Sequence, residues 1–269
     1  LGLPRRVCDR RAGPGGGGGC DVLVGVGDKF WGSGAARALG VRVYDYGVYL
    51  HAPSAARRLQ ALPAGAEPPD DAAVLDALVR GPLAADMSLV MVTARRLPLE
   101  TVGREVGGLL QRRLRKVGGS PEDPALAEML AGFTRPDALP PECLAGGGLL
   151  RKRSTVTFAR RGGRLRTSVA RAGGAPDVTV SEARSPDVCA AFFDTYLGSD
   201  PVHAGARRQT ADGARALRPG APGAARGPGA PGAAARLLPQ VARMQRLALA
   251  LTGMPLLPAR ALGAQQQGG

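Results

Sequence analysis

Residues 191–202, AFFDTYLGSDPV, are the stretch of the chain that says most about its fold. They complete a helix predicted at residues 187–197. Ser185 suits the N-cap of that helix, Pro186 suits its first turn, and Gly198 ends it. The stretch therefore joins the end of a helix to a turn that contains glycine and proline.

Strand patterns come before this helix. Residues 149–158 and 164–169 alternate in side-chain character, as strands with two different faces do, and Gly162-Gly163 between them predicts a hairpin turn. On the strand predicted at residues 41–50, Tyr44 and Tyr46 share one face because side chains alternate. The remaining predicted strands are residues 21–25, 87–93 and 177–181.

Apolar spacing and helix end signals predict helices at residues 52–62, 70–80, 99–116 and 124–133. The element order is then β, β, α, α, β, α, α, β, β, β, α. Strands joined by hairpins beside grouped helices predict an α+β fold, in which helices pack on one face of an antiparallel sheet.

The 269 residues include 36 basic and 22 acidic side chains, a formal net charge of +14. Residues 1–20 and 203–269 hold 13 basic and two acidic residues, whereas residues 21–202 hold 23 and 20. Most of the excess charge therefore lies in flanks rich in Gly, Pro, Ala and Arg, a composition that predicts disorder. We expect a Gly-rich flank at 1–20, one domain at 21–218 and a mostly disordered tail at 219–269. Within that tail, residues 237–251 are either a short helix that binds a partner or a membrane surface, or a frayed tail or mistranslated flanking sequence.

Several classes of function are disfavoured by composition. His51 and His203 are the only histidines, and the four cysteines have no CxxC spacing, so we expect neither a metal site nor a disulfide framework. No apolar run reaches the roughly 20 residues that span a bilayer. The pattern of interleaved basic and aromatic residues that binds single-stranded nucleic acid is missing. The chain begins with Leu1, so we expect a fragment, in which a targeting peptide would not be visible.

Familiar catalytic and cofactor motifs also fail. Gly25-Val26-Gly27 follows a strand, but Phe30 stands where a dinucleotide-binding loop needs its third glycine. His51 and His203 are interpreted as surface residues and Cys189 as a core residue. We expect no cofactor.

Three stretches together resemble the chalcone isomerase superfamily: residues 23–29 with 43–50, residues 163–169, and the opening stretch with its Phe-Phe-Asp-x-Tyr-Leu-Gly-x-Asp-Pro pattern. The resemblance covers about residues 21–217. It implies an open-faced β-sandwich, an antiparallel sheet with helices packed on one face and a cleft between them. The family includes isomerases, plastid proteins similar to fatty-acid binders, and auxiliary flavonoid-pathway proteins without catalysis.

Matching single positions favours the fatty-acid-binding branch. Where the isomerases have an arginine, this chain has Lys29, and where they have a threonine that helps polarise the substrate ketone, it has Tyr44, as that branch does. Pro98 and Glu105 align with the isomerases' tyrosine and asparagine. Thr195 alone matches their ring-lining residue.

The resemblance therefore implies a non-catalytic protein that binds a fatty acid or similar amphiphilic carboxylate, with Lys29, Tyr44 and Thr195 as ligand-binding residues. The alternatives are a chalcone–flavanone isomerase, an intramolecular lyase acting on a phenolic substrate, and an auxiliary flavonoid-pathway protein that acts through a partner. Each residue also has a plain structural interpretation: a solvated loop cation for Lys29, a core aromatic for Tyr44 and helix packing for Thr195. The resemblance implies the plastid stroma as the location, and the sequence leaves the oligomeric state open.

Overall fold

The structure is a computed structural model, and it describes residues 3, 6–7, 21–30, 42–63, 69–81, 84–135, 137, 139, 141–171 and 178–218. The chain divides into two units, Leu1–Ala224 and Ala225–Gly269, and every described residue belongs to the first. Most of the predicted flank at residues 1–20, the whole tail at 219–269 and its segment 237–251 lie outside the described residues.

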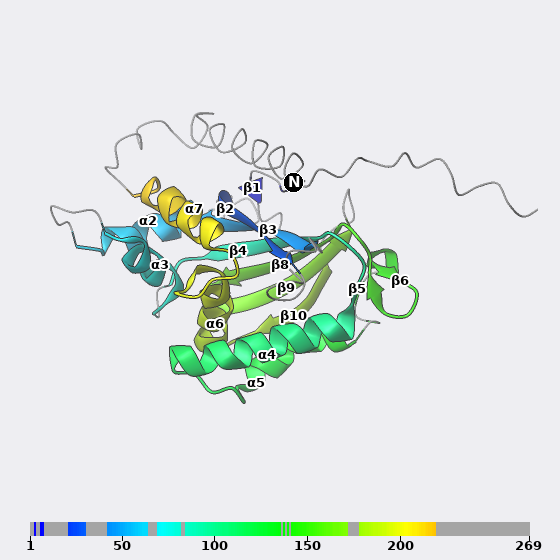
Figure 1. Cartoon of the computed structure of the whole chain (residues 1–269). Coiled ribbons are helices and arrows are strands. Elements are labelled where there is room, and N and C mark those ends of the chain that lie inside the picture. The colour runs from blue at the N-terminus through cyan, green and yellow to red at the C-terminus, as the bar shows by residue number, and fades with distance from the viewer. Residues whose placement is uncertain are drawn as a thin grey trace, which may run out of the picture. The chain divides into compact units, whose positions relative to one another are not determined.

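A seven-stranded antiparallel sheet forms one layer of the folded unit (Figure 1). Its strands, in order across the sheet, are β1 (Arg6–Val7), β2 (Asp21–Phe30), β3 (Arg42–His51), β4 (Met87–Thr93), β8 (Ser154–Arg161), β9 (Arg164–Arg171) and β10 (Val178–Ala183). A small second sheet joins β5 (Leu97–Pro98), β7 (Leu149–Leu150) and β6 (Leu144–Ala145), in that order.

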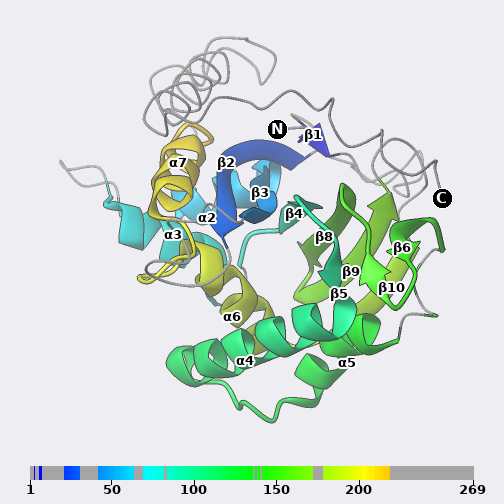
Figure 2. The same cartoon turned by 45° about the vertical axis from the view of Figure 1, so that its right-hand side comes forward.

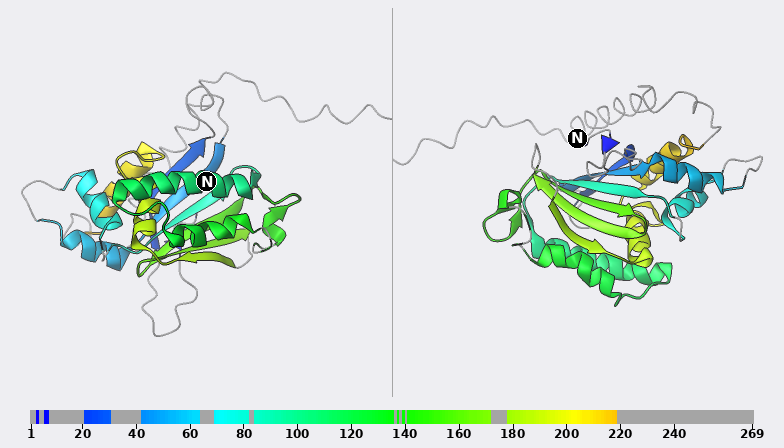
Figure 3. Two further views of the ribbon diagram at one scale, coloured as in Figure 1. Left: turned by 90° about the horizontal axis from the view of Figure 1, so that it is seen from below. Right: turned by 180° about the vertical axis from the view of Figure 1, so that it is seen from behind.

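Helices α4, α5 and α6 form a second layer across one face of the sheet, and α2, α3 and α7 gather at one end of it (Figures 1 and 2). The helices are α2 (Ala52–Gln60), α3 (Asp71–Val79), α4 (Leu99–Val117), α5 (Pro124–Thr134), α6 (Pro186–Leu197) and α7 (Ala204–Arg215), with a 3₁₀ turn at Pro141–Cys143. Seen from below, α4 and α5 lie in front of the sheet (Figure 3, left). The predicted α+β fold with helices on one face is confirmed.

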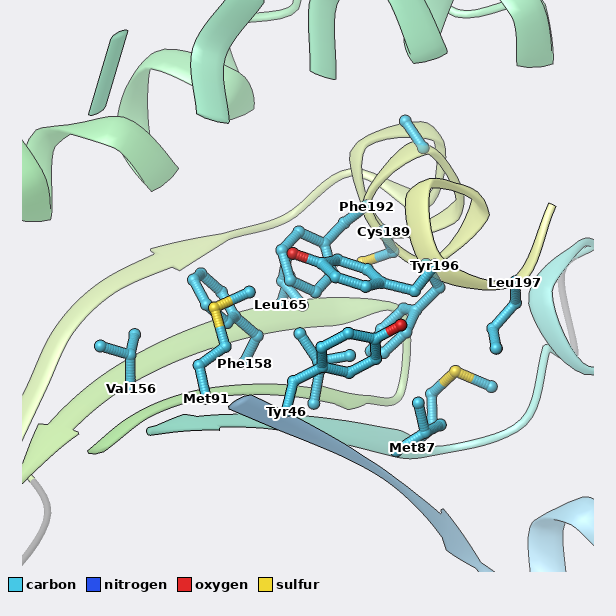
Figure 4. Packing of buried hydrophobic residues seen from close by; sticks show 14 of the residues in the cluster. Tyr46, Met87, Met91, Val156, Phe158, Leu165, Cys189, Phe192, Tyr196 and Leu197 are labelled. Carbon is cyan, nitrogen blue, oxygen red and sulfur yellow. The ribbon is translucent and has the colours of Figure 1, made fainter. Parts of the chain in front are cut away.

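Strand register sets which side chains meet the helices. Tyr44, Tyr46 and Val48 of β3 pair with Thr93, Met91 and Leu89 of β4, so these six side chains share one face. Figure 4 shows Tyr46 and Met91 on the sheet pointing toward Phe192 and Tyr196 of α6. The hydrophobic core therefore lies between the sheet and the helix layer.

Helix α6 explains why the opening stretch is so informative. Ser185 caps the helix by accepting a hydrogen bond from the Val188 amide at 3.2 Å. Asp194 is only 2% exposed, and its carboxylate lies 3.2 Å from Arg113 of α4 and 3.3 Å from Arg80. Arg113 also reaches the Asp200 carboxylate, at 3.4 Å. The two aspartates of the stretch thus tie α6 to α4 through one largely buried arginine.

Several features differ from the expectation. The strand predicted at residues 21–25 extends to Phe30. The strand predicted at residues 149–158 is divided by a turn, because Arg153 has a φ of 68° and turns the chain between β7 and β8. Helix α7 was not expected from apolar spacing, since its buried residues are Ala206, Thr210, Ala211 and Ala214. Small residues give no apolar stripe, although they allow close packing.

Helix α7 covers β2, which pairs with β1 only at its first two residues. The Val26 amide of β2 donates to the side chain of Gln209 at 3.1 Å. A methyl group added to Gly25 would lie 2.8 Å from the Ala206 carbonyl oxygen, so only glycine allows this approach. Gly27 likewise makes room for the Tyr46 ring. The Gly-x-Gly pair therefore serves packing in this fold.

Candidate functional site

A cavity of about 590 Å³ lies between the sheet and α4. Its wall is mostly apolar, and this volume falls within the roughly 300–1,000 Å³ typical of small-molecule sites. The lining side chains come from β2, β3, β4, β8 and the small sheet on one side and from α4, α5 and α6 on the other: Lys29, Val43, Tyr44, Met91, Thr93, Leu97, Pro98, Thr101, Val102, Glu105, Val106, Leu109, Leu110, Arg112, Phe133, Leu150, Val156, Phe158, Phe192, Thr195 and Tyr196.

Five aromatic rings of the lining belong to one continuous row of contacts. From Phe133 the row passes through Phe158, Phe192 and Tyr196 to Tyr46 and Tyr44, with neighbouring ring centroids 4.5 to 6.3 Å apart. Tyr46 is the one ring of the row that does not line the cavity. These separations are those of favourable edge and tilted ring pairs, so the row forms a firm apolar wall.

The Tyr44 and Tyr196 hydroxyls meet at one point of this wall. Their oxygens are 3.2 Å apart, and either hydroxyl can donate to the other. One of the two protons is used in that bond, which leaves the other hydroxyl proton free to donate to a ligand oxygen. Burial raises the pKa of Tyr44 to about 12, while the bond to Tyr196 acts in the opposite direction. Burial also raises the pKa of Tyr196 well above its ordinary value. Both groups are therefore neutral donors at physiological pH.

Lys29 is the direct cross-strand partner of Tyr44. Side chains of opposed residues on neighbouring antiparallel strands point to the same face, with Cβ atoms about 4.5–5.5 Å apart. Lys29 is exposed and also lines the cavity, so it stands at the mouth. It lies at the end of strand β2, rather than in the loop that its plain interpretation assumed.

Thr195 lines the same cavity but is only 1% exposed, and its hydroxyl donates to the Ala191 carbonyl oxygen at 3.0 Å. A hydroxyl engaged in this way can still accept a hydrogen bond, but its proton is not available to a carboxylate. The cavity thus brings together Lys29, Tyr44 and Thr195, of which Lys29 and Tyr44 have donors to offer. Their role in binding stays a prediction.

Helix α4 contributes polar side chains that the sequence analysis treated differently or passed over. Thr101, Glu105 and Arg112 line the cavity, and Glu105 and Arg112 are exposed. Pro98 lines it as well. Neither Pro98 nor an ionised Glu105 has a side-chain donor. Helical spacing was the signal that could have identified Tyr196 and Arg112, because Tyr196 follows Phe192 by four residues and Arg112 follows Glu105 by seven.

His203 and Cys189 have structural roles. His203 caps α7, because its Nδ1 accepts from the Ala206 amide at 3.0 Å, and its Nε2 lies 3.6 Å from the Asp28 carboxylate. Cys189 is buried, as expected for a core residue, and burial raises the pKa of its thiol to about 11. Within the described residues, no three His, Cys, Asp or Glu side chains gather into a possible metal site. No helix of that part is long and apolar enough to cross a membrane.

A comparison with solved structures identifies the fold. A crystal structure of the fatty-acid binding protein AtFAP1 of Arabidopsis thaliana matches with a TM-score of 0.59 and 20% sequence identity, over 79% of this chain and 98% of that one. The two proteins share a fold. No protein-family model matches the chain, and no curated protein matches it.

The shared fold is the one that the chalcone isomerase resemblance implied, an open sheet with helices packed on one face. The match spans nearly the full length of AtFAP1, so the two chains correspond as whole folded units. In this chain the space between sheet and helices holds the cavity described above. The cavity therefore lies between the sheet and the helices, where the resemblance implied a cleft.

Proposed function

We propose that this chain is a non-catalytic binding protein that holds a fatty acid or a similar amphiphilic carboxylate in the cavity. The observation that carries the proposal is the division of the lining. A long apolar wall with its row of aromatic rings ends at the Tyr44–Tyr196 hydroxyl pair, with Lys29 opposite Tyr44. The fold shared with a fatty-acid binding protein supports the same function.

The head group has the partners that a buried carboxylate needs. Taking a carboxylate out of water is costly unless it is paired with a cation and hydrogen-bonded. Lys29 supplies the cation, and the hydroxyl pair supplies one free proton, so the carboxylate would lie between them at the mouth. A hydrogen bond to an ionised group is worth about 1.5–3 kcal/mol.

The acyl chain would extend along the aromatic row, where Phe133, Phe158 and Phe192 line the cavity. Each buried methylene contributes about 0.8 kcal/mol. A chain of ten methylenes would therefore gain about 8 kcal/mol, more than the head group does. Apolar burial thus sets the affinity, while the polar end sets the orientation.

Cyclising a chalcone requires more hydrogen-bond donors than this site offers. The reaction moves negative charge onto a ketone oxygen, and catalysis requires several donors aimed at that charge. Pro98 and Glu105 line the cavity at the positions where the isomerases have a tyrosine and an asparagine, and neither offers a donor. The isomerases' threonine is replaced by Tyr44. These losses favour binding over catalysis.

The test uses the full chain purified from a bacterial host. Bound lipid is extracted for mass spectrometry, and chalcone cyclisation is measured against its spontaneous rate. Co-purifying fatty acids, reduced on substituting Lys29→Met but kept in Lys152→Met, are the expected result. Lys152 is the matched control because it is exposed and does not line the cavity.

Two outcomes would overturn the proposal. Turnover above the spontaneous rate that depends on Lys29 would identify an isomerase. A lipid-free protein that also takes up no added fatty acid would instead support an auxiliary protein that acts through a partner.

A further inference from the structure

Exposed cations gather at the end of the sheet where the cavity opens. We call this set the basic rim. It consists of Lys29 at the end of β2, Arg42 at the start of β3, and residues at the adjoining turns and strand ends: Arg95, Arg96, Arg151, Lys152, Arg153 and Arg171.

Strand register places the rim beside the mouth. Lys29 is opposed by Tyr44, and Tyr44 by Thr93 on the next strand. The Ser154 amide of β8 donates to the Thr93 hydroxyl at 3.0 Å, and Ser154 is opposed by Arg171 of β9. With neighbouring strands about 4.8 Å apart, this row spans roughly 20 Å. Lys29 lies at one end of this row and Arg171 at the other. Between them, Tyr44 and Thr93 line the cavity.

Thr93 holds two basic turns next to each other. Its hydroxyl donates to the Arg151 carbonyl oxygen at 2.8 Å, and its own carbonyl accepts from the Arg153 amide at 2.9 Å. Arg153 takes a left-handed conformation there, with φ 68°, which is uncommon for a residue other than glycine. Hydrogen bonds to Thr93 therefore hold the turn at residues 151–153 beside the turn at residues 94–96.

The charge of the rim is largely unneutralised. Asp45 pairs with Arg42 at 3.0 Å, and Asp28 lies 3.6 Å from His203 Nε2 and pairs with none of the rim cations. In the part of the chain that the structure describes, the rim cations other than Arg42 form no ion pair with an acid. One further acid lies near the rim: Glu142 is exposed and, like Arg151 and Arg171, lies close to Cys143.

The opposite end of the sheet is different. There Arg161 pairs with Asp21 at 2.5 Å, and Glu182 lies 3.5 Å from Arg164 and 3.2 Å from Arg184. Cations crowded without counter-charges repel one another and weaken the folded state. Three arginines at the far end have acidic partners, whereas most cations of the rim have none among the described residues, so the rim favours an anionic partner.

We propose that the basic rim docks the mouth of the cavity onto an anionic phospholipid surface, from which the ligand enters. This inference rests on the proposed function, because a fatty acid in water partitions into bilayers. Five arginine forks of the rim, besides Arg42, match phosphate oxygens, and clusters of Lys and Arg bind anionic lipids through charge alone. Lys29 belongs to both the rim and the cavity, so docking brings the head-group site to the surface.

The same surface fits a protein partner poorly. Protein interfaces have an apolar and aromatic centre that supplies most of their binding energy. Among the described residues, Val178 at the start of β10 is the only exposed large hydrophobic side chain, at 38%. A single exposed valine near the basic rim cannot form such an apolar centre. Binding to anionic lipid head groups does not require one.

The experiment measures co-sedimentation of the full chain with vesicles of phosphatidylcholine, with and without phosphatidylglycerol. We expect binding only to the anionic vesicles, and its loss as salt is raised, because exposed charges are screened. The variant Arg95→Glu/Lys152→Glu should bind these vesicles at least about tenfold more weakly. Arg57→Glu/Arg115→Glu is the matched control, since it changes the net charge equally at exposed positions outside the rim.

Fatty-acid affinity measured without vesicles separates the two proposals. The rim variant should keep that affinity and take up fatty acid from anionic vesicles more slowly than the control. Equal vesicle binding by both variants, or binding that ignores phosphatidylglycerol and salt, would overturn the rim as a lipid-docking surface while leaving the cavity function intact. Loss of fatty-acid binding in the unmodified chain would instead overturn the proposed function.

Discussion

Two tyrosines on one strand face have different surroundings, although they are two residues apart. The Tyr44 hydroxyl lines the cavity and bonds to Tyr196 at 3.2 Å. The Tyr46 hydroxyl is buried against Gly27 and has no hydrogen-bond partner in the described part. Their alternation predicted a shared face, and only packing distinguishes the hydroxyl that can meet a ligand from the one that cannot.

Substituting Tyr44→Phe should therefore weaken fatty-acid binding by about 1–2 kcal/mol, less than the full value of a hydrogen bond to a charged group, because the Tyr196 hydroxyl can still donate. This corresponds to roughly five- to thirtyfold in the dissociation constant, measurable by calorimetry or by displacement of a fluorescent fatty acid. Tyr46→Phe is the control and should leave the affinity unchanged. Equal affinities for the Tyr44 and Tyr46 variants would remove Tyr44 from the head-group site.

The raised pKa of Tyr44 makes a second prediction, about stability at alkaline pH. Between the ordinary value of 10.0 and the folded value of about 12, the unfolded chain loses this proton while the folded chain keeps it. The unfolded state then binds fewer protons, so the free energy of unfolding falls as pH rises through this window. Below pH 10 the contribution is fully present.

The Tyr44→Phe variant lacks this titration. Its free energy of unfolding should therefore fall less steeply than that of the unmodified chain between about pH 10 and 12, by up to about 1.4 kcal/mol per pH unit. Urea titrations across this range measure the difference. A gap between the two proteins that stays constant from pH 8 to 12 would contradict the prediction.

At the scale of elements, the buried ion pair between α6 and α4 is the feature most sensitive to substitution. Arg113→Met would leave the Asp194 carboxylate with Arg80 alone, whose side chain is 43% exposed. Removing one partner of a buried pair typically costs about 3–5 kcal/mol, and because Arg80 remains we expect the lower end. Urea unfolding measures this, and exposed Arg115→Met on the same helix should change stability by less than about 0.5 kcal/mol.

Elements with clear end signals and apolar spacing could be predicted from the sequence, and those without could not. The strand at residues 87–93 and the helices at 99–117 and 186–197 agree with expectation to within a residue. Helix α7 was not predicted because it packs through alanines, a threonine and Gly213, which show no apolar periodicity. The turn at Arg153, which separates β7 from β8, was not predicted because the alternation of side chains continues across it.

At the scale of the whole molecule, the candidate site was predictable only in part. Lys29 and Tyr44 could be named from the positions that they match in the family resemblance, and the structure pairs them across adjacent strands. Tyr196 could not be joined to Tyr44 from the sequence, since 152 positions separate them. The distribution of charge was also predicted only in part. Helix α7 brings Arg207, Arg208 and Arg215, which were counted with the basic flank, into the folded unit. The rim forms from strand ends and turns scattered between residues 29 and 171, so the sequence does not show it as a cluster.

A ligand that fills the cavity should stabilise the whole folded unit, because only the folded chain has the cavity. At about 100 times its dissociation constant, a fatty acid adds about 2.7 kcal/mol to the free energy of unfolding. For a domain of this size that raises the Tm by roughly 5–10 °C, which differential scanning fluorimetry measures. Val106→Trp places an indole in the cavity from the middle of α4 and should abolish the shift.

The control for that substitution lies on the same helix. Arg104 is exposed and does not line the cavity, so Arg104→Trp adds the same ring on the outer side and should keep the shift. Comparing the two variants without ligand also separates filling from damage, since a folded Val106→Trp protein with a normal Tm and no response to fatty acid has lost the cavity alone. A full shift in Val106→Trp would mean that the ligand binds elsewhere on the molecule, and the row of rings from Phe133 to Tyr44 would then be core packing and no more.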